Sequence, residues 1–134
     1  MPVFEYANFS AGEALYEVSV ISEEGRSLRA SGGLSVGTQA FDERVFDTAI
    51  VVGGDSILEQ APEGVLAYLR DSVKTARRTA SICSGAFVLA QAGLLDGRRA
   101  TTHWAYARDL QARFPSIKVE DDRIYVVDGS IWTS

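Results

Sequence analysis

Residues 79–92, TASICSGAFVLAQA, decide the fold that this sequence predicts. The first residues are small or β-branched and predict a strand, while those after Cys83 have the apolar spacing of a helix. A strand that turns sharply into a helix strains the residue at the corner and requires small neighbours two positions away on each side. Ser81 and Gly85 meet that requirement. The pattern therefore predicts a nucleophile elbow with Cys83 at its corner.

Cys83 is the only cysteine in the chain, so its environment decides what it can do. At a helix N-terminus, unpaired N–H groups and the helix dipole favour a thiolate, and we expect a nucleophile near neutral pH. The backbone N–H of Ser84, the next residue, would then donate to a developing oxyanion. The alternative is a cysteine at a strand end that packs as a small apolar side chain.

A second candidate feature is the pair Gly53 and Gly54. They follow residues 46–52, FDTAIVV, an apolar run typical of a strand buried on both faces in a parallel sheet. Two glycines allow a close backbone approach at the sheet edge where α/β proteins bind ligands, and Gly54 could supply a second oxyanion N–H. The alternative is a tight turn from strand to helix.

His103 is the only histidine. It is the last residue of a short predicted strand that ends with Thr101, Thr102 and His103. Parallel strands present their carboxyl ends at one edge, so this position brings His103 within reach of Cys83 as a base or an ion-pair partner. The alternative is a capping or surface histidine.

The remaining patterns alternate between helix and strand. Gly12 would stop a helix over 1–11, and Pro115 would close one over 104–114. Strands are expected over 16–21, 117–119, 123–127 and 130–133, with a turn at Asp121 and Asp122. A helix is expected over 62–78, and an irregular or short-stranded crossover over 28–41. The sequence thus predicts an α/β fold, a flavodoxin-like three-layer sandwich with a mostly parallel central sheet.

Length and charge restrict the function. The 134 residues suggest one domain, and 13 basic against 18 acidic residues give a net charge of −5. Such a chain is a poor candidate for direct binding to nucleic acid or membrane. Its one basic cluster, Lys74, Arg77 and Arg78, lies at the end of a predicted helix and is interpreted as complementing the dipole. A single cysteine excludes a multi-cysteine zinc site and favours the cytoplasm. We expect no metal or cofactor.

Two longer stretches resemble a known family. Residues 81–104, SICSGAFVLAQAGLLDGRRATTHW, resemble the ThiJ/PfpI family of the class I glutamine-amidotransferase-like fold. With residues 113–134, RFPSIKVEDDRIYVVDGSIWTS, the chain is most similar to the N-terminal domains of AraC-family transcriptional regulators. The resemblance implies an elbow nucleophile at Cys83, an oxyanion donor at Ser84, the glycine pair at Gly53 and Gly54, and the Thr-Thr-His histidine at His103.

The resemblance also predicts what the chain lacks. Residues 1–134 would form a single ThiJ/PfpI domain trimmed at both ends, without the first strand and the C-terminal helix. The carboxylate that accompanies the cysteine in the family would then lie outside this chain. Isonitrile hydratases share the motif region but usually have threonine after the cysteine, where this chain has Ser84.

Two functions follow as hypotheses. In the first, the chain is the ligand-sensing domain of a homodimeric AraC-type regulator, with DNA contacted by a separate domain. In the second, Cys83 attacks a small electrophilic carbon, as in an isonitrile hydratase, while Ser84 and Gly54 stabilise the anion. A weaker third hypothesis is redox sensing by oxidation of Cys83.

Overall fold

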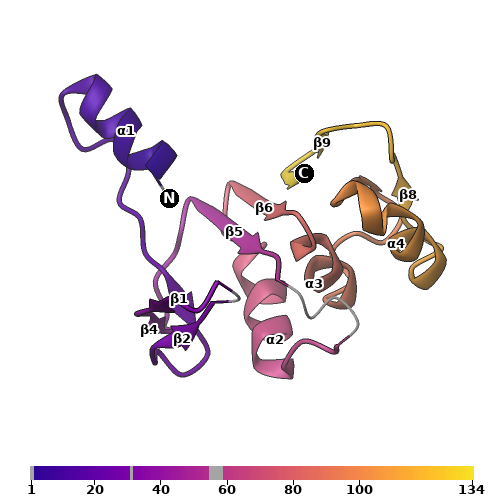
Figure 1. The fold of residues 1–134 in the computed structure, drawn as a ribbon, viewed down its shortest axis with the longest axis horizontal. Coiled ribbons are helices and arrows are strands. Elements are labelled where there is room, and N and C mark those ends of the chain that lie inside the picture. The colour runs from indigo at the N-terminus through magenta and orange to yellow at the C-terminus, as the bar shows by residue number, and fades with distance from the viewer. Residues whose placement is uncertain (1, 31, 55–58) are drawn as a thin grey trace. The chain divides into compact units, whose positions relative to one another are not determined.

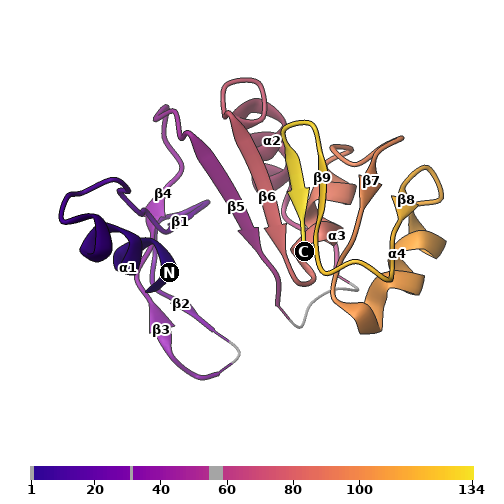
Figure 2. The same cartoon turned by 90° about the horizontal axis from the view of Figure 1, so that it is seen from above.

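The structure is a computed structural model that describes residues 2–30, 32–54 and 59–134. The chain divides into two compact units, residues 1–42 and 43–134, and each is described by itself. Figures 1 and 2 show their elements.

The first unit begins with helix α1, Pro2–Ala11. Gly12 ends the helix with a φ of 71°, and its N–H donates to the carbonyls of Asn8 and Phe9, as the sequence predicts. Four two-residue strands follow. β1, Ile21–Ser22, pairs in parallel with β4, Gln39–Ala40, while β2, Leu28–Arg29, pairs antiparallel with β3, Ser35–Val36. The predicted short-stranded character of 28–41 is confirmed.

The predicted strand over 16–21 is wrong except at its last residue. Both backbone groups of Tyr16 bond to one side chain: the Asn8 amide donates to the Tyr16 carbonyl at 2.7 Å, and the Tyr16 N–H donates to Asn8 Oδ1 at 2.8 Å. A backbone satisfied by a side chain has no groups left at that residue for a strand ladder.

The second unit contains a four-stranded mixed sheet in the order β5-β6-β10-β9 (Figure 2). The strands are β5, Thr48–Val52, β6, Arg78–Ile82, β9, Val126–Asp128, and β10, Ile131–Thr133. β5, β6 and β10 run parallel, whereas β9 is antiparallel to β10. A separate parallel pair joins β7, Arg99–Ala100, to β8, Lys118–Val119. The predicted α/β fold with a mostly parallel sheet is confirmed.

Helices α2, Glu63–Ser72, and α3, Gly85–Gln91, pack against each other, and α3 contacts β5 and β6. A 3₁₀ turn, η1, Trp104–Tyr106, leads into α4, Ala107–Arg113. The core combines side chains from helices, strands and turns, chiefly Leu66, Leu69, Phe87, Leu89, Leu95, Leu110, Ile117 and Ile131.

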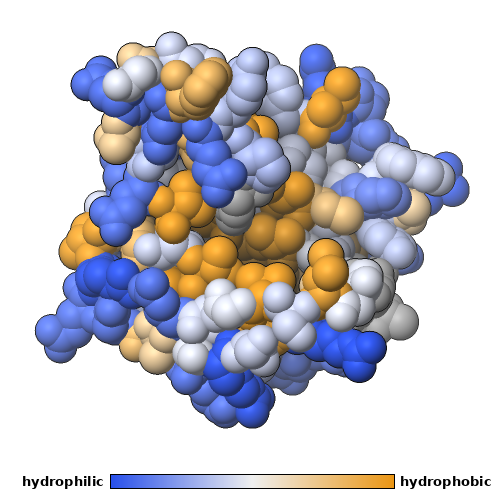
Figure 3. Space-filling view, turned by 60° about the vertical axis from the view of Figure 1, so that its left-hand side comes forward, coloured by the Kyte–Doolittle hydropathy of each residue, from blue (hydrophilic) through white to orange (hydrophobic). Residues whose placement is uncertain are grey.

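Burial alternates along β6 and β10. In β10 both Ile131 and Thr133 are buried, while Trp132 between them is 38% exposed. Large apolar side chains are exposed in both units, and Figure 3 shows such residues (orange) among polar ones on the face it presents.

Several predicted boundaries need correction. The helix predicted over 62–78 ends at Ser72, because the chain must turn before β6 begins at Arg78. At this end the Ser72 hydroxyl donates to the Leu69 carbonyl. The strand predicted over 123–127 begins only at Val126. The Thr101 hydroxyl donates to the Arg123 carbonyl at 3.2 Å, which directs that backbone group to a side chain.

The helix-dipole interpretation of the basic cluster is also wrong, because the helix ends before all three residues. Lys74 pairs with Asp71 at 2.6 Å, Arg77 pairs with Asp47 at 2.8 Å, and the Arg78 guanidinium lies 4.2 Å from the centre of the Trp132 ring. These cations have partners within the second unit.

Candidate functional site

Cys83 lies at the corner between β6 and α3 with a φ of 59°, and it is the only non-glycine residue of the described ranges with a positive φ. This is the strained geometry expected at a nucleophile elbow. Two hydrogen bonds hold the corner: the Cys83 N–H donates to the Ser134 carbonyl at 2.7 Å, and the Thr102 hydroxyl donates to the Cys83 carbonyl at 2.9 Å. The thiol is free and partly exposed.

The small residues beside the corner are required by backbone packing. A Cβ on Gly85 would lie 2.4 Å from the Val51 carbonyl oxygen, and one on Gly53 would lie 2.6 Å from the Ser84 nitrogen. Such distances are far inside van der Waals contact, so the end of β5 and the start of α3 approach each other only because both residues lack a side chain. The close approach predicted for the glycine pair is therefore made by Gly53 alone among the two, and it is made to the elbow itself.

The hydroxyl of Ser84 joins the elbow to the second glycine. Ser84 Oγ accepts from the Gly54 N–H at 3.0 Å and donates to the Gly54 carbonyl at 2.8 Å. Ser84 is buried, and its hydroxyl makes no cap bond to α3. The Gly54 N–H that sequence reasoning assigned to an oxyanion thus donates to Ser84 Oγ in this structure.

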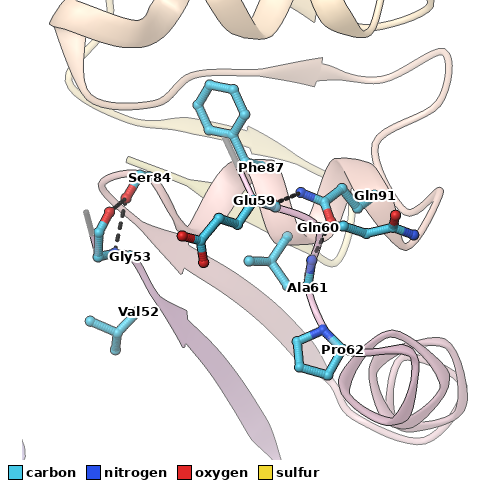
Figure 4. Close-up of a pocket in the computed structure, with 11 residues that line it drawn as sticks. Val52, Gly53, Glu59, Gln60, Ala61, Pro62, Ser84, Phe87 and Gln91 are labelled. Carbon is cyan, nitrogen blue, oxygen red and sulfur yellow. Dashed lines mark hydrogen bonds between the residues drawn. The ribbon is translucent and has the colours of Figure 1, made fainter. Parts of the chain in front are cut away.

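Gly53, Gly54 and Ser84 line a hollow of about 180 Å³ (Figure 4). Its other wall comes from residues 59–62, which precede α2, and from α3. The Gln91 side-chain amide joins the two, because it accepts from the Ala61 N–H at 2.7 Å and donates to the Glu59 carbonyl at 3.2 Å. Cys83 is not among the residues that line this hollow.

Cys83 and His103 line a second, larger hollow of about 450 Å³. Sequence reasoning expected these two residues at one edge of the sheet, and the structure brings them to one cavity. The remaining lining residues are Ile82, Thr102, Trp104, Asp121, Asp122, Arg123, Ile124 and Ser134. The predicted site residues are therefore divided between two hollows, with the glycine pair and Ser84 in one and Cys83 and His103 in the other.

His103 immediately precedes η1. Its Nδ1 accepts from the Ala105 N–H at 3.2 Å, so the residue caps the turn, and its ring lies 5.3 Å from the ring centres of Trp104 and Tyr106. The capping alternative raised from the sequence is thus present together with a position in the Cys83 hollow.

Sequence reasoning missed the wall formed by residues 121–124. Asp121 and Asp122 were interpreted only as a turn, although a polar turn next to a predicted strand edge was the available signal. Trp104 and Ile124, both lining the hollow, are 79% and 89% exposed. Exposed aromatic and aliphatic residues of this size commonly mark binding surfaces.

This wall is held by an ion-pair network. Arg99 hydrogen-bonds to Glu120, an interaction that lowers the pKa of Glu120, and Arg123 lies 3.7 Å from the same carboxylate. The Glu120 N–H donates to the Ala100 carbonyl at 2.9 Å, extending the pairing of β7 and β8. The network connects Arg123 in the wall to β7.

Over the described ranges, no group of three histidine, cysteine or carboxylate side chains is arranged to hold a metal ion. The same ranges contain no helix long and apolar enough to cross a membrane.

Comparison with known proteins identifies the class to which this fold and elbow belong. The DJ-1/PfpI family matches residues 3–134, and the chain belongs to that family. A crystal structure of a putative transcriptional regulator from Vibrio parahaemolyticus superposes with a TM-score of 0.81 at 26% identity, covering 99% of this chain and 73% of the other.

Three relatives are similar to this chain in sequence. An uncharacterized protein in the cpoL 5′ region of Streptomyces lividans is 43% identical, covering 85% of this chain and 82% of its own length. The HTH-type transcriptional regulator GbdR of Pseudomonas aeruginosa is 32% identical over 96% of this chain but only 35% of its own length. The isonitrile hydratase of Pseudomonas putida is 38% identical over 87% of this chain and 47% of its own length.

Proposed function

We propose that this chain is the ligand-sensing domain of an AraC-type transcriptional regulator, and that the Cys83 hollow binds the small molecule. DNA would be contacted by a separate domain of the regulator. The resemblance found in residues 81–104 and 113–134 supports the same assignment.

The observation that carries this proposal is the asymmetry of the match to GbdR, which covers nearly all of this chain and about a third of the regulator. The regulator GlxA of Rhizobium meliloti gives the same asymmetry, with 95% of this chain and 40% of the relative. Similarity confined to one part of a longer regulator is expected when that part is a separable sensing domain.

The hollow suits a small ligand. Its volume of about 450 Å³ lies within the usual range for small-molecule sites, and it combines apolar, aromatic and charged side chains around a partly exposed thiol. The acidic net charge of −5 agrees with a domain that leaves phosphate contacts to another part of the protein.

Tryptophan fluorescence provides the first test, because only Trp104 and Trp132 contribute. We would titrate the protein with a panel of small metabolites. A ligand in the hollow should change the emission of Trp104 in wild type, and the change should be absent in Trp104→Phe, where Trp132 still reports on folding. Binding that is unchanged in Cys83→Trp, which fills the hollow, would refute the site.

The proposed role in transcriptional regulation is tested on the full native gene product. Its affinity for DNA from its own promoter region should change when the compound found by fluorescence is added. A native protein that binds no DNA, with or without the compound, would end the regulator proposal.

A second candidate function is hydration of an isonitrile. The observation that favours it is the strained, partly exposed Cys83 in a chain that is 38% identical to an isonitrile hydratase. Cys83 would add to the isonitrile carbon and water would then release the formamide, with the acid and base supplied by a carboxylate outside this chain. The test is formamide production by wild type and by Cys83→Ala, and equal rates in the two would eliminate this function.

We also propose a homodimer, in line with the family resemblance. Sedimentation at micromolar concentration tests it, and a monomer under those conditions would overturn it.

A further inference from the structure

The histidine of the Cys83 hollow is constrained by its own backbone. His103 has a φ of −51° and a ψ of 129°, which is the extended geometry of a cap residue, and its Nδ1 accepts the N–H of Ala105 at 3.2 Å. The chain runs directly from this residue into η1. The bond therefore fixes the ring relative to the turn that carries Trp104.

This bond has a chemical consequence for the ring. A neutral imidazole has one nitrogen that donates and one that accepts. Because Nδ1 accepts from an amide N–H, it must present a lone pair, and the proton of the neutral ring is placed on Nε2. Protonating Nδ1 would set two N–H groups against each other and remove the cap.

We infer that His103 acts in the Cys83 hollow as a neutral hydrogen-bond donor through Nε2–H, and that it is not the base or the cationic partner of Cys83. The atom it would contact is an acceptor: a carbonyl or carboxylate oxygen of the ligand, or the Cys83 sulfur as thiolate. The position of the ring proton is a property of the free protein, whereas donation to a ligand rests on the proposed function of the hollow.

Other groups around the ring bear on this inference. Asp121, Asp122 and Arg123 line the same hollow from the segment before β9, and Tyr106 and Trp104 flank the ring from η1. Groups of both signs thus share the hollow with the ring. A neutral donor has its proton on Nε2 alone, whereas a cationic partner carries a proton on each ring nitrogen.

Nitrogen NMR of the uniformly ¹⁵N-labelled protein measures that state directly, and the single histidine makes assignment unambiguous. At mildly alkaline pH we expect a protonated Nε2, an unprotonated Nδ1, and a scalar coupling across the hydrogen bond between the Ala105 nitrogen and Nδ1. The same spectrum is expected for Cys83→Ala. A proton on Nδ1 in either protein overturns the inference.

A thiolate–imidazolium pair predicts a different pattern. Both ring nitrogens would be protonated in wild type, and one would lose its proton in Cys83→Ala, since the negative partner is then missing. Observation of that difference would restore His103 as the cationic partner of the cysteine.

Donation from Nε2–H to an acceptor in the hollow is tested with iodoacetamide, which transfers its carbamoylmethyl group to the Cys83 sulfur with loss of iodide. The attached amide carbonyl offers an acceptor inside the hollow. We expect the Nε2 proton signal to move downfield in the alkylated protein, and an unchanged signal would overturn donation into the hollow. Neither result depends on DNA binding or formamide production, so failure here is distinguishable from failure of the proposed function.

Discussion

Gly53 and Gly54 offer a matched pair of substitutions in adjacent residues. A Cβ on Gly53 would lie 2.3 Å from Ser84 Oγ, 2.6 Å from the Ser84 nitrogen and 2.7 Å from the Gly85 nitrogen. A Cβ on Gly54 would meet nothing within 4 Å among the described residues. Neither glycine has a positive φ, so alanine meets no positive-φ strain at either position.

Gly53→Ala should therefore destabilise the protein, while Gly54→Ala should not. Forcing a methyl group against two backbone nitrogens costs roughly 1–3 kcal/mol. Displacing Ser84 from Gly54 loses two hydrogen bonds worth about 1 kcal/mol each. We expect a loss of about 3 kcal/mol in the free energy of unfolding, which is a decrease in Tm of about 10 °C at this chain length.

Urea unfolding followed by circular dichroism measures both variants. Alanine reduces the entropy of the unfolded chain similarly at the two positions, by about 0.4–1 kcal/mol, so the difference between the variants isolates the collision. If Gly53→Ala were within about 0.5 kcal/mol of Gly54→Ala, the packing of Gly53 on the elbow would be refuted.

Three further predictions concern strain, burial and charge. Cys83→Gly should unfold with a free energy about 1 kcal/mol higher than Cys83→Ala, because glycine accepts a φ of 59° without strain; equal unfolding curves would contradict strain at the elbow. Thr79→Val should stabilise the protein by about 1 kcal/mol, since the buried Thr79 hydroxyl has no partner within the described ranges, and a destabilised variant in the same urea experiment would show that the hydroxyl is bonded. Hydrogen bonds from Arg77 and Thr48 lower the pKa of Asp47 from 3.8 to about 2, so its stabilising contribution is complete above pH 4 and is lost as the pH falls towards 2. Asp47→Asn should accordingly flatten the dependence of Tm on pH in that window, and an unchanged slope would show that the pair contributes nothing.

The elbow was predictable because several local signals agree at one place. Ser81 and Gly85 flank Cys83, the residues before it favour a strand, and those after it favour a helix. These signals depend only on neighbours in the sequence. The sequence predicted a close backbone approach at the glycine pair. It did not predict that the elbow is the segment that approaches.

What the sequence could not supply was side-chain hydrogen bonding between distant residues. Asn8 removes Tyr16 from a strand, and Ser84 Oγ engages Gly54. Neither bond has a periodic signature, because each depends on where the fold places one short polar side chain. The sequence predicted only a turn at Asp121 and Asp122, because their place in the wall of the Cys83 hollow also depends on the fold.

The position of β10 in the sheet has a consequence for how the protein folds. β10 lies beside β6, and the Ser134 hydroxyl donates to the Ser81 carbonyl, 53 residues away in sequence. During synthesis β6 can pair with β5 at once, yet its other edge stays open until β10 emerges from the ribosome. Such non-local pairing slows folding and leaves an edge able to pair with other chains. The nascent protein is therefore most prone to aggregation in that interval, before the backbone N–H of Cys83 has found its acceptor in Ser134.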